Sequence, residues 1–184
     1  MTALEPPSVP TGAEIRTALL EAGAVRFGAF TLASGERSDT YIDVKKAWTD
    51  PARLGLLARA LAARAGSEER LAGMELGAVP LVVAVALRTG RPYVVLRKAA
   101  KEHGTRQAYE GEIPAGSRVL LIEDVTTTGG STVRCVELVR AAGGVVDRAL
   151  VVVDRGAGAL DRLAAVGVRL EPLVTLAELR SARK

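Results

Sequence analysis

The stretch V-L-L-I-E-D-V-T-T-T-G-G-S-T, residues 119–132, constrains the fold of this chain more than any other segment. Its apolar start predicts a short buried strand, and two adjacent acids follow at the carboxyl end of that strand. A loop of Thr, Gly and Ser then leads into Val133 to Val139, whose apolar periodicity predicts a helix. Because ligands of open α/β sheets bind outside the carboxyl ends of strands, this order predicts an α/β fold with a ligand site at the turn.

The loop is suited to a phosphate group, because a Gly- and Thr-rich turn at a helix N-terminus offers backbone N–H groups and a partial positive charge. Glu123 and Asp124 cannot serve the phosphate. They suit hydroxyl groups, or a hydrated metal ion held by the same ligand. No Lys follows the glycines and no G-x-G-x-x-G spacing is present, so the loop is neither a Walker A nor a dinucleotide fingerprint. The pattern predicts a sugar phosphate, with its diol on the acids and its phosphate on the loop.

Composition predicts one globular domain over residues 1–184, since 48% of the residues are hydrophobic and 25% are charged. The apolar runs are short, and the N-terminus has neither the basic nor the long apolar region of a secretory signal, so we expect no membrane association. The lone Cys135 fits a cytoplasmic location and a place in the core. A net charge of +4 could indicate a nucleic-acid partner, but the basic residues are scattered and only 3% of residues are aromatic, so we expect none.

Strand and helix patterns alternate along the chain, which predicts a doubly wound, mainly parallel sheet flanked by helices. An irregular arm is expected over residues 1–10, which contain three prolines. The expected helices are Thr11 to about Glu21, Pro51 to near Gly66, Pro80 to Leu87, Leu160 to Val166 and a short one at the C-terminus. The other expected strands are Phe27 to Leu32, Thr40 to Val44, Leu71 to Glu75, Tyr93 to Leu96, Val145 to Val153 and one near Val168 to Leu170.

A basic segment, R-K-A-A-K-E-H-G at residues 97–104, directly follows a predicted strand. Arg97, Lys98, Lys101 and His103 could all bind phosphate oxygens, although a solvated basic loop is the alternative. The polar connection over residues 98–116 is long for a compact domain. We therefore expect a mobile loop that closes over a reacting diphosphate and excludes water.

Three motifs together resemble the orotate phosphoribosyltransferases, a branch of the type I phosphoribosyltransferases. They are F-T-L-A-S-G at residues 30–35, the basic segment at 97–104, and E-D-V-T-T-T-G-G-S at 123–131. The resemblance extends from about Glu14 to Leu179 and includes 73–80, which matches the diphosphate-facing loop of that family. It implies a type I phosphoribosyltransferase fold with a small N-terminal hood over residues 11–48 and a mobile catalytic loop over 98–116.

The resemblance implies transfer of phosphoribosyl from phosphoribosyl diphosphate (PRPP) to orotate, giving orotidine 5′-monophosphate and diphosphate in UMP biosynthesis. It implies a homodimer with active sites shared between subunits, and Mg²⁺ carried by PRPP near the two acids without direct protein ligands. The implied catalytic residues are Lys101, His103 and Asp124. The residues implied to bind PRPP are Arg97, Lys98, Lys101, His103, Glu123, Asp124, Val125, Thr126, Thr127, Thr128, Gly129, Gly130 and Ser131. Those implied to bind orotate are Tyr41, Ile42, Thr127 and Arg155.

The chain departs from this family at three positions. Ala33 and Gly77 stand where many bacterial members carry Lys, so two cationic contacts are missing, and Glu123 replaces an aspartate. Two alternatives remain open at this point: a phosphoribosyltransferase for another base, and a PRPP-sensing regulator that has lost the chemistry.

Overall fold

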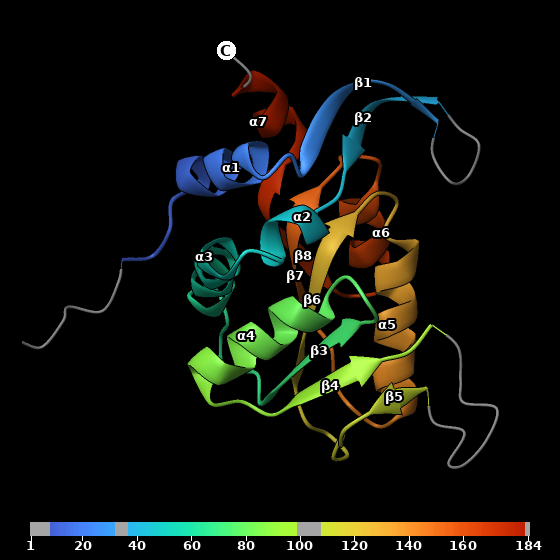
Figure 1. The fold of residues 1–184 in the computed structure, drawn as a ribbon. Coiled ribbons are helices and arrows are strands. Elements are labelled where there is room, and N and C mark those ends of the chain that lie inside the picture. Colours follow the sequence, from blue (N-terminus) through green and yellow to red (C-terminus); the bar gives the residue numbers. More distant parts are fainter. Residues whose placement is uncertain (1–7, 32–36, 99–107, 183–184) are drawn as a thin grey trace, which may run out of the picture.

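A six-stranded sheet forms the centre of the protein in the computed structural model, which describes residues 8–31, 37–98 and 108–182 (Figure 1). The strand order is β5-β4-β3-β6-β7-β8, and every neighbouring pair is parallel except β4 with β5. The strands are β3 (Arg70–Met74), β4 (Tyr93–Leu96), β5 (Tyr109–Glu110), β6 (Val119–Thr126), β7 (Arg148–Asp154) and β8 (Arg169–Thr175). The strand that carries the two acids, β6, is therefore central.

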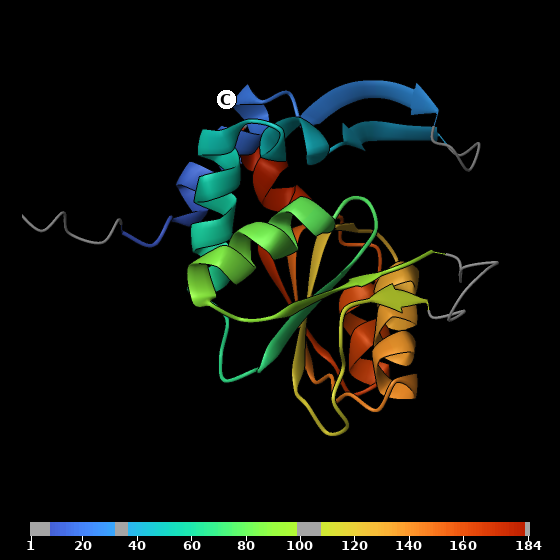
Figure 2. The same ribbon diagram turned by 60° about the horizontal axis from the view of Figure 1, so that its bottom comes forward.

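Helices cover both faces of this sheet, as the doubly wound prediction requires (Figures 1 and 2). One face carries α3 (Pro51–Ala62) and α4 (Val79–Thr89), and the other carries α5 (Gly130–Ala141) and α6 (Ala159–Ala165). Alternate residues of β6 enter the two cores: Leu120 and Ile122 pack with α3 and α4, whereas Val119 and Leu121 pack with α5 and α6. The two acids follow directly, near the end of this strand.

The N-terminal elements form a small layer beyond the end of the sheet where β6 and β7 terminate (Figure 1). They are α1 (Gly12–Glu21), the antiparallel strands β1 (Val25–Thr31) and β2 (Arg37–Ile42), and α2 (Lys45–Trp48). Helix α7 (Leu176–Ser181) fixes this layer, because the Arg180 guanidinium donates to Asp39 Oδ1 at 2.5 Å and to Thr40 Oγ1 at 3.2 Å. The chain from β2 thus reaches the site edge of the sheet in a defined position.

Some boundaries differ from those expected. The helix that begins at Pro51 ends at Ala62, and the N–H of Gly66 is instead bound by the Glu68 carboxylate at 2.7 Å. The last strand continues to Thr175 through Pro172, which is tolerated because β8 lies at the sheet edge and a missing N–H costs little there. Helix α2 and the short β5 were not expected at all. In the part of the chain that the structure describes, no helix has the length and apolar character to cross a membrane.

Candidate active site

The two acids lie at the carboxyl end of β6 in different surroundings. Glu123 is buried, with 7% of its surface exposed, whereas Asp124 is half-buried. The Asp124 N–H donates to Glu123 Oε1 at 3.2 Å, and the Val125 N–H donates to Asp124 Oδ1 at 2.9 Å. Burial, and then the hydrogen bond and negative charge of Asp124, raise the pKa of Glu123 well above its usual value, while nearby Lys98 opposes this. Of the two acids, Glu123 therefore keeps its proton to a higher pH than an exposed glutamate.

The Thr- and Gly-rich turn over residues 126–131, called the phosphate loop after its predicted ligand, joins β6 to α5. Helix α5 begins at Gly130, and Gly129 before it has φ 78°, a left-handed conformation in which an added Cβ would also lie 2.8 Å from Leu163 Cδ2. Thr127, Thr128, Gly130 and Ser131 are exposed at this turn, so their backbone groups and hydroxyls are open to a ligand. Thr126, in contrast, is 1% exposed, and its hydroxyl has no hydrogen-bond partner among the described residues. Thr126 can therefore contribute a backbone group more readily than its side chain.

The turn after β3 packs against Asp124. A Cβ placed on Gly77 would lie 2.6 Å from Cγ and 2.8 Å from Oδ1 of Asp124, closer than any side chain allows. Any side chain at this position, including the lysine expected from the resemblance, would therefore require the Asp124 carboxylate to shift. Gly77 therefore carries no cationic side chain, and its lack of a Cβ is what allows the turn to approach Asp124 so closely.

The start of the basic segment is firmly held. The Arg97 guanidinium pairs with Glu110 Oε1 of β5 at 3.1 Å, and the Arg97 N–H donates to the carbonyl of Ala108 at 2.8 Å. The Lys98 N–H donates to the Glu75 carboxylate at 3.0 Å. Lys101 and His103, the other predicted members, lie outside the described residues.

Arg155, one of the predicted orotate residues, contacts the hood strand β2 where β7 ends. Arg155 follows β7 directly, and its N–H donates to the Thr126 carbonyl at 3.0 Å. Its guanidinium donates to Ser38 Oγ at 3.2 Å and to the Thr40 carbonyl at 3.4 Å, next to the predicted Tyr41 and Ile42. The structure thus brings Arg155, the hood strand β2 and the phosphate loop together.

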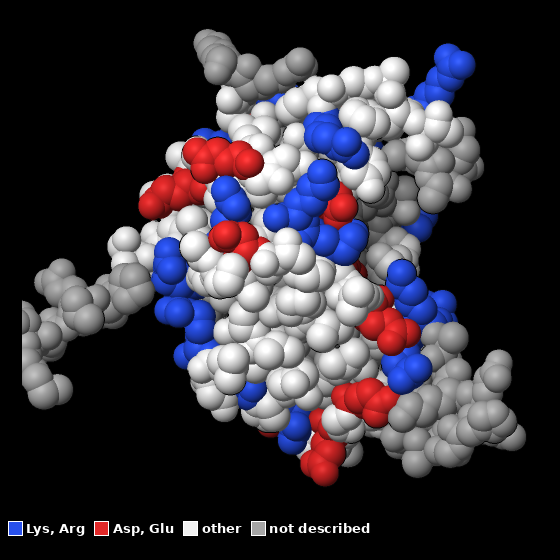
Figure 3. Space-filling view, in the orientation of Figure 1, with Lys and Arg blue, Asp and Glu red and all other residues white. Residues whose placement is uncertain are grey.

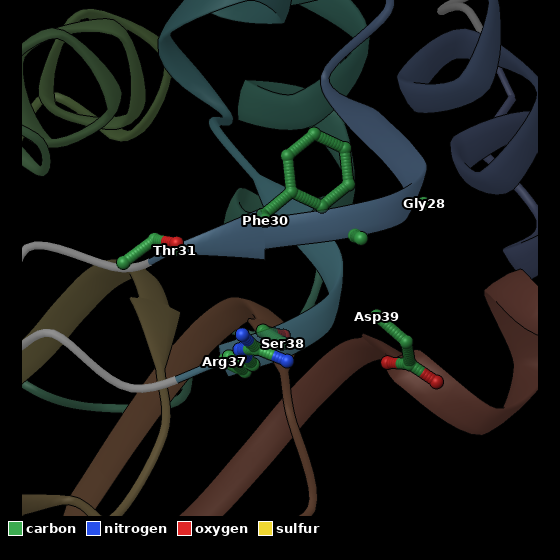
Figure 4. A pocket seen from close by; sticks show the side chains of 7 residues that line it. Gly28, Phe30, Thr31, Arg37, Ser38 and Asp39 are labelled. Atoms are coloured by element: carbon green, nitrogen blue, oxygen red, sulfur yellow. The ribbon is translucent and has the colours of Figure 1, made fainter.

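A cavity of about 610 Å³ opens beside this meeting point, between the two hood strands (Figure 4). Phe30 and Thr31 on β1 line it across from Arg37, Ser38 and Asp39 on β2. Ser38 also accepts the Arg155 bond, so the cavity joins one end of the site. The two acids do not line it, and the phosphate loop is an open surface.

Three residues near the site were not among those predicted from the sequence. Lys45, at the start of α2, pairs with Asp43 at 2.7 Å, and Asp43 first and Asp124 less strongly raise the pKa of Lys45. Figure 3 shows basic side chains with acids between them over this side of the molecule, where α2 lies. Glu75 and Arg134 are the others: both bind the Lys98 backbone. Glu75 lies in the segment 73–80 that the resemblance indicates, whereas no sequence signal separates Lys45 or Arg134 from solvated charges.

Comparison with known proteins identifies the family of this chain. The phosphoribosyl transferase domain family matches residues 53–172. An orotate phosphoribosyltransferase of Thermococcus gammatolerans is 53% identical over 116 residues, which are 61% of this chain and 61% of that protein. The match with this relative thus spans about three fifths of its length. An orotate phosphoribosyltransferase of Methanocaldococcus jannaschii is 46% identical over 164 residues, or 89% of this chain and 93% of the relative.

Solved structures extend the comparison over nearly the whole chain. The orotate phosphoribosyltransferase of Aeropyrum pernix has a TM-score of 0.82 at 36% identity, covering 91% of this chain and 96% of that one. That of Mycobacterium tuberculosis in complex with PRPP has a TM-score of 0.75 at 32% identity, covering 93% and 99%.

Proposed function

This chain belongs to the orotate phosphoribosyltransferases within the phosphoribosyl transferase domain family, and we propose that it transfers phosphoribosyl from PRPP to orotate. One observation supports this most: Arg155 lies between the phosphate loop and the hood strand β2, next to Tyr41 and Ile42. A guanidinium there is placed to bind the carboxylate that distinguishes orotate from uracil. The proposal assigns residues 1–184 to a single domain, and its products would be orotidine 5′-monophosphate and diphosphate for UMP synthesis.

The proposed roles follow from the charges on the site. When diphosphate leaves, negative charge builds on the leaving group and positive charge on the sugar, so the enzyme must stabilise both. Glu123 and Asp124 would hold the ribose diol and favour the cationic sugar, while Thr126 to Ser131 would hold the 5′-phosphate. Arg97, Lys98, Lys101 and His103 would face the leaving diphosphate. No covalent nucleophile is required.

Mg²⁺ fits this site as a companion of the substrate. Among the described residues no group of three acids, histidines or cysteines could cage a metal ion, and Mg²⁺ in such sites is bound by one or two carboxylates and the phosphates of the substrate. Glu123 and Asp124 could supply hydrogen bonds to its water shell. When bound, the ion would neutralise charge on the diphosphate.

The direct test is an assay with PRPP and Mg²⁺ in which orotate is offered beside uracil, hypoxanthine and adenine. We expect orotate to be used and uracil to be poor by a factor of about 10⁴, because a site built for a polar group strongly rejects an analogue that lacks it. Comparable turnover of uracil would refute the role of Arg155. Preference for a purine would establish the alternative, a transferase for another base, and PRPP binding without turnover of any base would indicate a regulator.

We further propose a cytoplasmic homodimer in which Lys101 and His103 act in the partner's site. Exposed apolar side chains on one side of the molecule support such an interface, since Leu87 of α4 is 83% exposed and Tyr93 of β4 is 41% exposed. Lys101→Ala and Asp124→Asn homodimers should each be nearly inactive. After subunit exchange, activity should return towards about a quarter of wild type, because half the dimers are mixed and each has one intact site.

Subunit exchange in this experiment is checked by native mass spectrometry, with each variant incubated alone as the control. Exchange without recovery would mean that Lys101 acts within its own subunit. A monomeric mass for the wild-type protein would refute the dimer itself.

A further inference from the structure

Both hydrogen-bonding groups of the Lys98 backbone are bound by charged side chains from other segments. The Lys98 N–H donates to Glu75 Oε1 at 3.0 Å, and the Lys98 carbonyl accepts from Arg134 Nη2 at 2.5 Å. Charge-assisted hydrogen bonds of this kind are shorter and about twice as strong as neutral ones. The backbone is thus held from two sides at the residue that precedes the rest of the basic segment.

Glu75 carries a negative charge at a place where the proposed site binds an anionic group. It belongs to the turn after β3, which approaches Asp124 and, in the proposed function, faces a diphosphate. A carboxylate there repels a polyanion, unless its charge is used elsewhere. Its own N–H donates to the Leu96 carbonyl at 2.8 Å, so the side chain is anchored beside the end of β4 and reaches Lys98.

Arg134 binds the Lys98 backbone from a different element, helix α5. It is the fifth residue of α5 and is exposed, so its guanidinium can leave the helix surface. Its guanidinium donates to the carbonyl of Lys98, a residue 36 positions earlier in the sequence. Since α5 begins at the phosphate loop, Arg134 connects that loop to the basic segment.

We propose that Glu75 and Arg134 are positioning residues, which hold Lys98 so that its ammonium group is directed to the diphosphate of PRPP. This inference rests on the proposed function. Three segments that approach different parts of the substrate meet at Lys98: the turn after β3, the end of β4 and helix α5. The charge of Lys98 also lowers the pKa of Glu123, against the larger effects of burial and Asp124.

The test compares ligands with and without a diphosphate. PRPP and orotidine 5′-monophosphate share the phosphoribosyl group, but only PRPP carries the diphosphate. Calorimetric titrations with Mg²⁺ would be made on Glu75→Ala and Arg134→Ala, and on the conservative Glu75→Gln, which keeps an acceptor oxygen. Exposed charges serve as matched controls: Glu137→Ala, one turn further along α5, and Arg88→Ala on α4. Thermal melting shows that each variant is folded.

Each alanine variant should bind PRPP about ten-fold more weakly, as expected for one charge-assisted hydrogen bond, and bind the monophosphate as wild type does. Glu75→Gln should regain most of the loss. Because both side chains act on one residue, the double alanine variant should lose less than the product of the two single losses. The controls should match wild type.

Two results would overturn the inference: PRPP binding that is unchanged in both alanine variants, or binding of the monophosphate that weakens as much as binding of PRPP. The second would mean a general disturbance of the site. A wild-type protein that binds neither ligand would instead overturn the proposed function, and this inference with it.

Discussion

Glu123→Gln should make the protein more stable while it lowers activity. Glu123 is 7% exposed, and the hydrogen bond that its carboxyl group accepts from the Asp124 N–H is 3.2 Å long. Burial is the largest cause of its raised pKa, followed by the interaction with Asp124. Glutamine has nearly the same shape, and its amide can donate to Asp124 as a protonated Glu123 would. The substitution therefore removes a buried negative charge without leaving a cavity.

The sign of the pH dependence follows from the raised pKa. The folded protein keeps the Glu123 proton to a higher pH than the unfolded chain, whose glutamates titrate near 4.5. The contribution of Glu123 to stability is therefore complete below that value and is lost as the pH rises through the folded pKa. Glutamine does not titrate, so the advantage of Glu123→Gln should be small at pH 5 and should grow as the pH rises.

A buried polar group that is incompletely paired costs about 1–3 kcal/mol, and we expect a gain of about 2 kcal/mol at alkaline pH. For a chain of this length that corresponds to about 4–8 °C in melting temperature. Differential scanning fluorimetry from pH 5 to pH 9, without ligand, measures the difference, and Glu137→Gln on the exposed side of α5 is the control. A gain that is equal at every pH, or a variant less stable than wild type throughout, would refute the reasoning.

Three further outcomes are expected. Gly77→Ala should lower kcat/KM about ten-fold with a small loss of stability. Its Cβ would lie 2.6 Å from Asp124 Cγ and would force the carboxylate away from the Val125 N–H. The control is Gly55→Ala, whose Cβ would have nothing within 4 Å and which should keep full activity in the same assay. Glu68→Ala should cost about 2 kcal/mol in urea unfolding, since it removes the buried carboxylate 2.6 Å from the Arg148 guanidinium, which keeps only Glu171 as an ion-pair partner. Its kcat at 25 °C should stay near wild type, and a large fall would mean that this ion pair also shapes the site. Asp124→Asn should melt close to wild type but lose most activity, and a large fall in melting temperature would make Asp124 structural.

The strand, acids, loop and helix over residues 119–141 could be predicted because their signals are local. Apolar residues set the strand, and Gly129 supplies the left-handed conformation that starts the helix. The alternating pattern also predicted the doubly wound sheet correctly. The roles of Lys101 and His103 stay predictions, since both lie outside the described residues.

What the sequence could not provide is the choice of partners between distant segments. Arg155 and Ser38 are 117 residues apart, so the cavity beside them could not be foreseen from either segment alone. Glu75 and Arg134 carry charges typical of solvated surfaces, and only the folded sheet places them on Lys98. Such pairings depend on strand order, which hydrophobic periodicity does not specify.

One charge of this site is unfavourable for the isolated chain. Glu123 is buried beside another acid, and both effects raise its pKa. Local stability would favour a neutral residue at this position. A ligand that carries a diol, two anionic groups and a metal ion supplies the opposite charges and the hydrogen bonds that the free protein lacks. The buried carboxyl group of Glu123 is thus consistent with a ligand that supplies such groups. PRPP should therefore stabilise wild type more than Glu123→Gln, and equal shifts in melting temperature would contradict this explanation.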